Sequence, residues 1–136
     1  MSKNGPLILV DDDNDDQELM IFTLEELGVK NKVITFNTAE SALSFLYQTK
    51  EEPFLIISDI NMPKMDGIAF KKKIDSCSIL NSRSIPFVFV STCTNGIPEA
   101  RELNIQGYFQ KSNSMEQLAK TMDAIVTYWN LTQHKN

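Results

Sequence analysis

The chain has 136 residues, 42% of them hydrophobic and 23% charged, which suits one globular domain with its own core and leaves no room for a second. Its formal net charge of −5 and the lack of any long basic run argue against direct binding to nucleic acid. No apolar run nears the roughly 20 residues that cross a bilayer, no signal-peptide pattern opens the chain, and the two cysteines have no motif spacing, so we expect a cytoplasmic protein without membrane contact or disulfides.

The first half of the chain alternates between predicted strands and helices. Residues 6–10 are apolar throughout, which is typical of a strand buried on both faces. An acidic first turn and an apolar stripe predict a helix over residues 14–27. A strand over 32–36, a helix over 38–48 and an apolar strand over 54–58 follow in that order.

The second half continues the same alternation. A helix is predicted over residues 67–77, and a strand over 87–90 follows it. Pro98 fits the first turn of a short helix that ends near residue 103, and residues 107–110 form a fifth, short strand. The last helix, over about 113–130, opens with a capping-box pattern and carries apolar residues at helical spacing.

This alternation predicts an α/β protein. Right-handed crossovers place successive strands parallel in one sheet with helices on both faces, which is a doubly wound architecture. No repeat, linker or low-complexity segment divides the chain. We therefore expect a single domain over residues 1–136, with its core at about 6–130 and a polar tail at 131–136.

Polar side chains follow four of the predicted strands at the point where each strand ends. Asp11 and Asp12 follow the first strand, Asp59 the third, Ser91 the fourth and Lys111 the fifth. The carboxyl ends of parallel strands meet at one edge of the sheet, where ligands bind in open α/β folds. Three carboxylates, a hydroxyl and an ammonium at this edge favour a divalent cation together with a phosphoryl group.

These carboxylates can act in two ways, as a nucleophile and as ligands of a cation. Asp59 can act as a nucleophile and form an acyl phosphate, provided that a cation offsets the charge of the phosphoryl oxygens. Mg²⁺ prefers oxygen ligands and often takes only one or two carboxylates. One of Asp11 and Asp12 can therefore bind it directly while the other holds a coordinated water. Capping of the following helix is the alternative for this pair.

The remaining aspartates of the cluster, Asp13, Asp15 and Asp16, are expected only to cap the next helix and to suit its dipole. Asp11, Asp13 and Asp15 also match the first three ligand positions of an EF-hand loop. That loop requires Gly at its sixth position and Glu at its twelfth, where this chain has Asp16 and Phe22. An EF-hand is therefore excluded.

Taken in order, the strand-end segments resemble the receiver domain of two-component response regulators over essentially the whole chain. The segment after the third strand is the most specific to that family. The matching segments are Leu7–Asp12, Ile57–Gly67, Ile85–Ser91 and Gly107–Lys111. The resemblance implies a flavodoxin-like fold of five strands in the order 2-1-3-4-5.

The resemblance also implies roles at the acidic end of the site. Asp59 is the expected phosphoacceptor, taking a phosphoryl group from a histidine kinase or a histidine phosphotransfer protein. Mg²⁺ is the expected cofactor. Asp12 would bind it directly and Asp11 mainly through water, with Asp59 and the backbone carbonyl of Asn61 completing the ligands from the protein.

Three further residues are implicated in phosphoryl binding and switching. Ser91 and Lys111 would each bind a phosphoryl oxygen. Tyr108 holds the switch-aromatic position and would turn inward as Ser91 moves. This movement would alter the surface of the fourth helix, fifth strand and fifth helix, where we expect an unidentified protein partner or a phosphorylation-linked homodimer to bind.

Two positions depart from the family pattern. Ser112 follows Lys111 where the family usually has Pro, which favours another loop path since cis peptides are costly outside proline. Thr92 replaces a smaller residue next to Ser91 and narrows access to the site. Neither change removes a group that phosphorylation needs.

With only a few residues after the last helix, we expect a stand-alone receiver that signals by partner binding or by passing the phosphoryl group along a relay. It would not be an enzyme beyond self-phosphorylation and slow autodephosphorylation. Two alternatives remain. A phosphatase of the haloacid-dehalogenase type would use Asp11 as its nucleophile. A pseudo-receiver would bind partners without phosphorylation, so that Asp59→Ala would leave binding unchanged.

Overall fold

The computed structural model describes residues 4–92, 98–111 and 114–131. Strands and helices alternate along the chain, with bounds that differ from the predicted ones by one or two residues. In chain order the elements are β1 (Leu7–Val10), α1 (Asn14–Glu26), β2 (Val33–Phe36), α2 (Ala39–Gln48), β3 (Leu55–Ser58), α3 (Gly67–Ser76), α4 (Ser78–Ser82), β4 (Phe87–Ser91), α5 (Pro98–Glu102), β5 (Gly107–Gln110) and α6 (Met115–Leu131).

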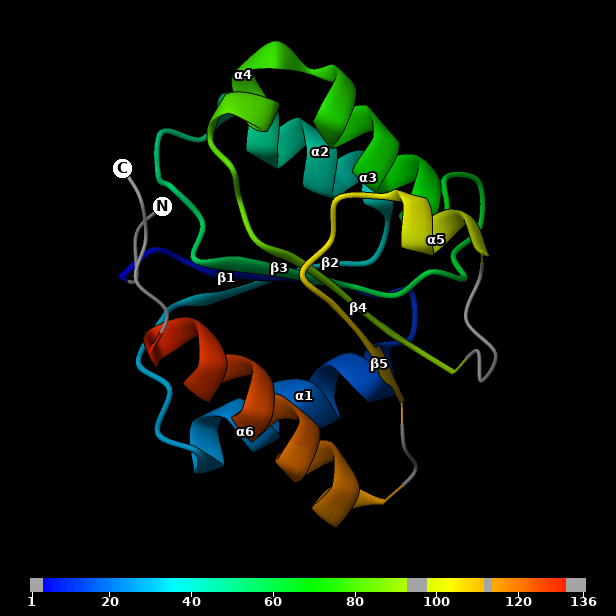
Figure 1. Ribbon diagram of the computed structural model, residues 1–136. Coiled ribbons are helices and arrows are strands. Elements are labelled where there is room, and N and C mark those ends of the chain that lie inside the picture. Colours follow the sequence, from blue (N-terminus) through cyan, green and yellow to red (C-terminus); the bar gives the residue numbers. More distant parts are fainter. Residues whose placement is uncertain (1–3, 93–97, 112–113, 132–136) are drawn as a thin grey trace.

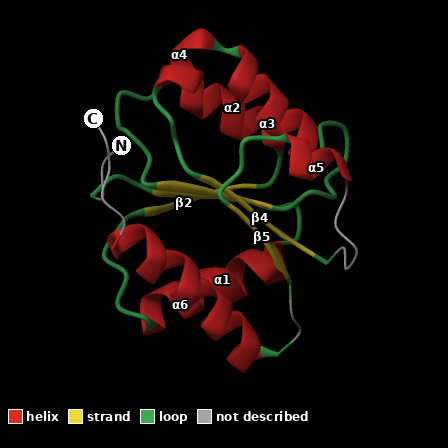
Figure 2. Cartoon of the chain, in the orientation of Figure 1, coloured by secondary structure: helices red, strands yellow, loops and turns green. Residues whose placement is uncertain are grey.

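The strands form one parallel sheet in the order β2-β1-β3-β4-β5. Figures 1 and 2 show helices on both faces, with α1 and α6 on one side and α2 to α5 on the other. The predicted doubly wound, flavodoxin-like fold and its strand order are thereby confirmed. The carboxyl ends of the strands lie at one edge of this sheet because all five run in the same direction.

Two apolar layers hold the helices to the sheet. β1, β3 and β4 are buried along their whole length, and their alternate residues face opposite sides. Ile8 and Val10 pack in the layer under α2 and α3, while Leu7 and Leu9 pack in the layer against α1 and α6. Each large apolar side chain that is fully buried stabilises the fold by about 1.5–3 kcal/mol. This packing fixes the positions of the strands and of the polar groups that follow them.

The helix termini confirm the predicted cap at Asp13 and show two further caps. The side chain of Asp13 caps α1 by accepting from the amides of Asp15 and Asp16, and Thr38 caps α2. The last helix instead begins at Met115. Its cap is Ser114, whose hydroxyl accepts from the amide of Gln117 at 3.3 Å. The predicted cap at Asn113 lies outside the described residues.

One helix was not predicted at all. The sequence predicts a single helix over 67–77, whereas the structure ends α3 at Ser76 and adds the five-residue α4. Cys77 adopts an extended backbone between them, and α4 has no side-chain hydrogen bond at its start. Buried Leu80 holds α4 in the core layer, so this turn depends on tertiary packing. Among the described residues, no helix combines the length and the apolar character needed to cross a membrane.

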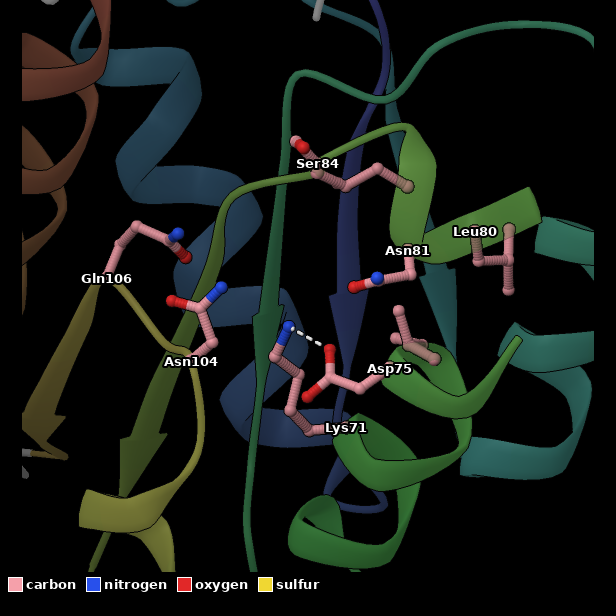
Figure 3. Close-up of a pocket in the computed structure, with 9 residues that line it drawn as sticks. Lys71, Asp75, Leu80, Asn81, Ser84, Asn104 and Gln106 are labelled. Carbon is pink, nitrogen blue, oxygen red and sulfur yellow. Dashed lines mark hydrogen bonds and ion pairs between the residues drawn. The ribbon is translucent and has the colours of Figure 1, made fainter. Parts of the chain in front are cut away.

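Lys71 occupies a position on the buried stripe of α3. Its ammonium donates to Asp75 at 2.8 Å and lies 5.5 Å from the centre of the Phe87 ring. Figure 3 shows this pair at a small cavity of about 70 Å³, ringed by polar groups that include Asn81 and Asn104. Asp75 is the acidic residue of this lining, so it is the charge that compensates the buried lysine.

We expect Asp75→Asn to lower the free energy of unfolding by about 1–3 kcal/mol, because it leaves a buried ammonium without its counter-charge. Lys71→Met should stay within about 1.5 kcal/mol of the wild type, since it replaces the ion with an apolar side chain of similar length. Urea unfolding at pH 7 measures both. Glu51→Gln, which breaks an exposed pair with Lys32, is the control and should cost less than about 1 kcal/mol. Equal values for Asp75→Asn and Glu51→Gln would contradict this account.

Candidate functional site

The ends of β1 and β3 bring two aspartates together. Val10 pairs with Ser58 in the sheet, and the amide of Asp59 donates to the carbonyl of Val10 at 2.9 Å. Asp11 and Asp59 are both buried, whereas Asp12 is exposed. One carboxylate oxygen from each of the three lies within 4.8 Å of the others. The predicted acidic cluster is therefore present at the predicted edge.

A close backbone approach holds Asp59 in place. Its Oδ1 accepts from the amide of Ile60 at 2.7 Å, and the amide of Gly67 donates to the carbonyl of Ile60 at 2.8 Å. A Cβ at position 67 would lie 2.2 Å from the carbonyl oxygen of Asp59. Only glycine fits there, so the start of α3 can pack directly against the loop that carries Asp59.

Gln17 fixes the backbone on the other side of the site. This buried side chain on α1 donates to the carbonyls of Asp11 at 2.7 Å and of Phe36 at 2.9 Å. It thereby joins the ends of β1 and β2 to the first helix. The Asp11 carboxylate is oriented in turn by the amide of Asp13, which donates to its Oδ1 at 2.9 Å.

Lys111 completes the pocket from the end of β5. Its amide donates to the carbonyl of Ser91 at 2.7 Å, and its side chain is only 8% exposed. The ammonium lies 2.7 Å from Asp11 Oδ2, 2.8 Å from Asp16 Oδ2 and 3.2 Å from Asp59 Oδ2. The prediction that Asp16 serves only the helix terminus is thus wrong. It belongs to the site, and its partner 95 residues away left no local signal in the sequence.

The charges of the pocket are out of balance, and two pKa values reflect this. Burial raises the pKa of Asp11 to about 6, although the Lys111 ammonium and the Asp13 amide both act to lower it. Burial alone would lower the pKa of Lys111, but the carboxylates of Asp11 and Asp16 outweigh it and raise the pKa well above its usual value. Burial is thus the main cause of the shift at Asp11, with a smaller contribution from the charge of Asp59, whereas the neighbouring carboxylates cause the shift at Lys111.

The acidic cluster fits a hard divalent cation. Asp11 Oδ2 is buried and has an ion-pair contact with Lys111, but it has no partner in hydrogen-bond geometry. A carboxylate oxygen of Asp11, together with one from Asp12 and one from Asp59, forms the only group of three or more potential metal-ligating side chains found among the described residues. Carboxylate oxygens are the ligands that Mg²⁺ and Mn²⁺ accept.

The remaining predicted residues lie on β4 and β5 or in the loops that follow strands. Ser91 is fully buried at the end of β4, next to the strand that carries Lys111. Tyr108 is half-buried in β5, with its ring 6.4 Å from that of Phe89. Asn61 is exposed in the loop after β3, two residues beyond Asp59. Thr92 is exposed, and Ser112 lies outside the described residues.

The fold and the pocket together define a flavodoxin-like protein with an acidic, lysine-containing site at the carboxyl edge of its sheet. Comparison with known families makes this assignment more specific, because the model of the response regulator receiver domain matches residues 7–123. The chain belongs to the response regulator receiver family of two-component systems, as its sequence predicts. Members of this family are signalling proteins.

Known relatives are similar over most of their length. Response regulator Rcp1 of Synechocystis is 28% identical over 130 residues, which cover 90% of this chain and 87% of Rcp1. Chemotaxis protein CheY-3 of Vibrio cholerae is 26% identical over 126 residues, covering 92% of this chain and 94% of CheY-3.

Two solved structures share the fold closely. The phosphorylated cyanobacterial phytochrome response regulator RcpA superposes with a TM-score of 0.85 at 29% identity, covering 96% of this chain and 97% of RcpA. The Mn(2+)-bound form of Rcp1 gives a TM-score of 0.81 at 27% identity, covering 97% of this chain and 99% of that one.

The raised pKa of Asp11 predicts a pH-dependent effect of Asp11→Asn. The ordinary pKa of 3.8 applies to the unfolded chain, so between about pH 4 and 6 the folded state keeps a proton that the unfolded state has lost. Rising pH therefore destabilises the wild type through this group, and the variant escapes the effect. Without divalent cations, we expect the variant to be more stable by about 1–3 kcal/mol at pH 7 and nearly equal below about pH 4.

Urea unfolding in EDTA over pH 4–8 measures this difference. Glu18→Gln, an exposed position on α1, is the control and should show no comparable increase between pH 5 and 7. If Asp11→Asn were less stable than the wild type at pH 7, the cost assigned to burying the Asp11 carboxylate would be wrong.

Proposed function

We propose that this chain is a phosphorylation-controlled receiver in which Asp59 accepts a phosphoryl group from a phosphohistidine, in a Mg²⁺-dependent reaction. The donor would be a histidine kinase or a histidine phosphotransfer protein. One observation carries this proposal: the Lys111 ammonium lies 3.2 Å from Asp59 Oδ2, inside a cluster of carboxylates fit for a cation. A carboxylate nucleophile, a cation site and a fixed ammonium are the groups that phosphoryl transfer to aspartate requires.

The chemistry follows from how these groups are held. A carboxylate oxygen of Asp59 forms a bond to phosphorus while the bond from phosphorus to the donor's imidazole nitrogen breaks, and its electron pair stays on that nitrogen. Oδ1 is held by the Ile60 amide and Oδ2 faces Lys111, so the carboxylate is oriented before the donor arrives. Lys111 and the Ser91 hydroxyl would donate to phosphoryl oxygens.

A bound Mg²⁺ would offset the charge of the phosphoryl oxygens. Asp11, Asp12 and Asp59 are the side chains that would hold it, with the backbone carbonyl of Asn61 as a further ligand. One oxygen from each of these side chains lies within 4.8 Å of the others. The Mn²⁺-bound form of Rcp1 and the phosphorylated form of RcpA support both parts of this proposal by similarity.

The output would pass through the neighbouring strand ends. We infer that Ser91 moves toward the phosphoryl group and that Tyr108 turns inward, altering the surface of α5, β5 and α6. The pairing of Phe89 with Tyr108 across β4 and β5, with their rings 6.4 Å apart, supports this coupling. An unidentified protein, or a second phosphorylated copy, would bind there. Transfer of the phosphoryl group along a relay would use the same Asp59.

We further propose that residues 1–136 act as one receiver domain. Its activity would be signalling, with self-phosphorylation and slow autodephosphorylation as its only catalysis. Because phosphohistidine is made from ATP, the cytoplasm is the compartment that fits this reaction.

Incubation with Mg²⁺ and acetyl phosphate should add one phosphoryl group to the wild type and none to Asp59→Ala. Intact-protein mass spectrometry measures the adduct, which should be acid-stable and base-labile as an acyl phosphate is. Borohydride reduction and peptide mapping then locate it. A label on Asp11 would instead favour the phosphatase alternative, and a wild type that accepts no group even from a kinase would favour a pseudo-receiver.

Mg²⁺ should stabilise the folded wild type, since it binds the assembled cluster and not the unfolded chain. The expected gain is about 2.7 kcal/mol at 100 times the dissociation constant, seen as a rise in melting temperature with MgCl₂ compared with EDTA. Asp12→Ala should remove most of this gain. Glu18→Gln, away from the cluster, should retain it. A melting temperature of the wild type indifferent to millimolar Mg²⁺ would contradict the assigned cation site.

A further inference from the structure

Lys111 has three ammonium hydrogens and three carboxylate neighbours, and one of these neighbours lies outside the group assigned to the cation. Asp11 and Asp59 belong to the cluster that fits Mg²⁺, whereas Asp16 does not. We propose that Asp16 is a positioning residue that keeps the Lys111 ammonium in the pocket while the site is loaded. This role rests on the proposed function.

The contact is well placed to restrain the lysine. Asp16 Oδ2 lies 2.8 Å from the ammonium, and the amide of Asp16 donates to Asp13 Oδ1 at 3.1 Å, which fixes the first turn of α1. The side chain of Asp16 is 33% exposed, while that of Lys111 is 8% exposed. The pair therefore joins α1 to the end of β5 at the mouth of the pocket, with the ammonium on the buried side.

Loading the site changes the other two contacts. Oxygens of Asp11 and Asp59 that bind a cation share less of their charge with Lys111, and a cation also repels the ammonium across the few ångströms that separate them. A long, strongly hydrated lysine side chain that loses two of its three partners gains both entropy and solvation by extending into water. Asp16 is the partner that still holds it close to Asp59.

A positioned ammonium favours transfer of the phosphoryl group, because its orientation is settled before the reaction. Without Asp16, Lys111 would have to return from solvent during each transfer. Asp15 provides a matched comparison: it stands in the same turn of α1, carries the same charge, is exposed and forms no ion pair with Lys111. Any general effect of removing a negative charge from this helix terminus should appear equally at both positions.

The first experiment measures the accessibility of Lys111 rather than activity. Wild type, Asp16→Ala and Asp15→Ala are treated briefly with an amine-acetylating reagent in saturating MgCl₂, and labelling is quantified by peptide mass spectrometry with exposed Lys30 as the internal reference. We expect Asp16→Ala to raise the labelling rate of Lys111 about fivefold or more, as loss of one charge-assisted contact implies, and Asp15→Ala to leave it unchanged. Equal labelling in all three proteins would overturn the proposal.

The second measurement is the rate of phosphorylation by acetyl phosphate in the same proteins. Asp16→Ala should be slower by about fivefold or more and Asp15→Ala should not, while Asp16→Glu should recover part of the loss. In a Lys111→Met background, Asp16→Ala should have no further effect, because it acts through the lysine. An equal loss in that background would overturn the proposal.

The two measurements separate this inference from the proposed function. If the wild type takes no phosphoryl group, the proposed function fails, and the labelling result alone decides whether Asp16 holds Lys111. If Lys111 becomes accessible in Asp16→Ala while phosphorylation stays at the wild-type rate, the restraint is real but has no role in transfer, and the positioning role is overturned.

Discussion

An excess of negative charge in one pocket is the constraint on which the rest of this site depends. In the described part of the chain, four carboxylates gather near one ammonium, that of Lys111. The consequence is visible in the pKa of Lys111, which these carboxylates raise despite its burial, while burial raises the pKa of Asp11 and the charge of Asp59 adds to that shift. Such an arrangement opposes folding unless something offsets it. Its chemical value would be that it attracts a cation to Asp59, the carboxylate proposed as the nucleophile.

The fold tolerates the repulsion between these carboxylates because they follow the ends of strands whose positions are fixed by packing. β1, β3 and β4 are buried between two apolar layers, and each strand end is tied to its neighbour through the backbone. The amides of Asp59 and Lys111 donate to the carbonyls of Val10 and Ser91, and Gln17 closes the edge at β2. Apolar burial thus supplies the free energy that holds like charges together, as is common where a site is kept in readiness for a ligand.

The sequence predicts the parts of this design that follow from strand direction. Once Leu7–Val10 and Leu55–Ser58 are recognised as parallel strands, Asp11 and Asp59 must meet, because the carboxyl ends share one edge. The parts it does not predict depend on tertiary contacts. Asp16 reads as an ordinary acidic residue at a helix terminus until the end of β5 is placed beside it. The sequence likewise gives no signal of the burial of Lys71 or of a helix over residues 78–82, because both depend on packing that involves Phe87 and Leu80.

The same charge balance constrains the order of events in a receiver of this kind. A phosphoryl group brings further negative charge to a pocket whose ammonium already faces three carboxylates, so Lys111 alone cannot compensate it. If Asp59 accepts a phosphoryl group as proposed, positive charge would have to be in place at Asp11, Asp12 and Asp59 before the group arrives. Lys111 would then exchange a carboxylate for a phosphoryl oxygen. In the proposed role, Asp16 would hold the ammonium near Asp59 during that exchange from outside the cation cluster, so that one lysine would serve first as the counter-charge of the pocket and then as a ligand of the phosphoryl group.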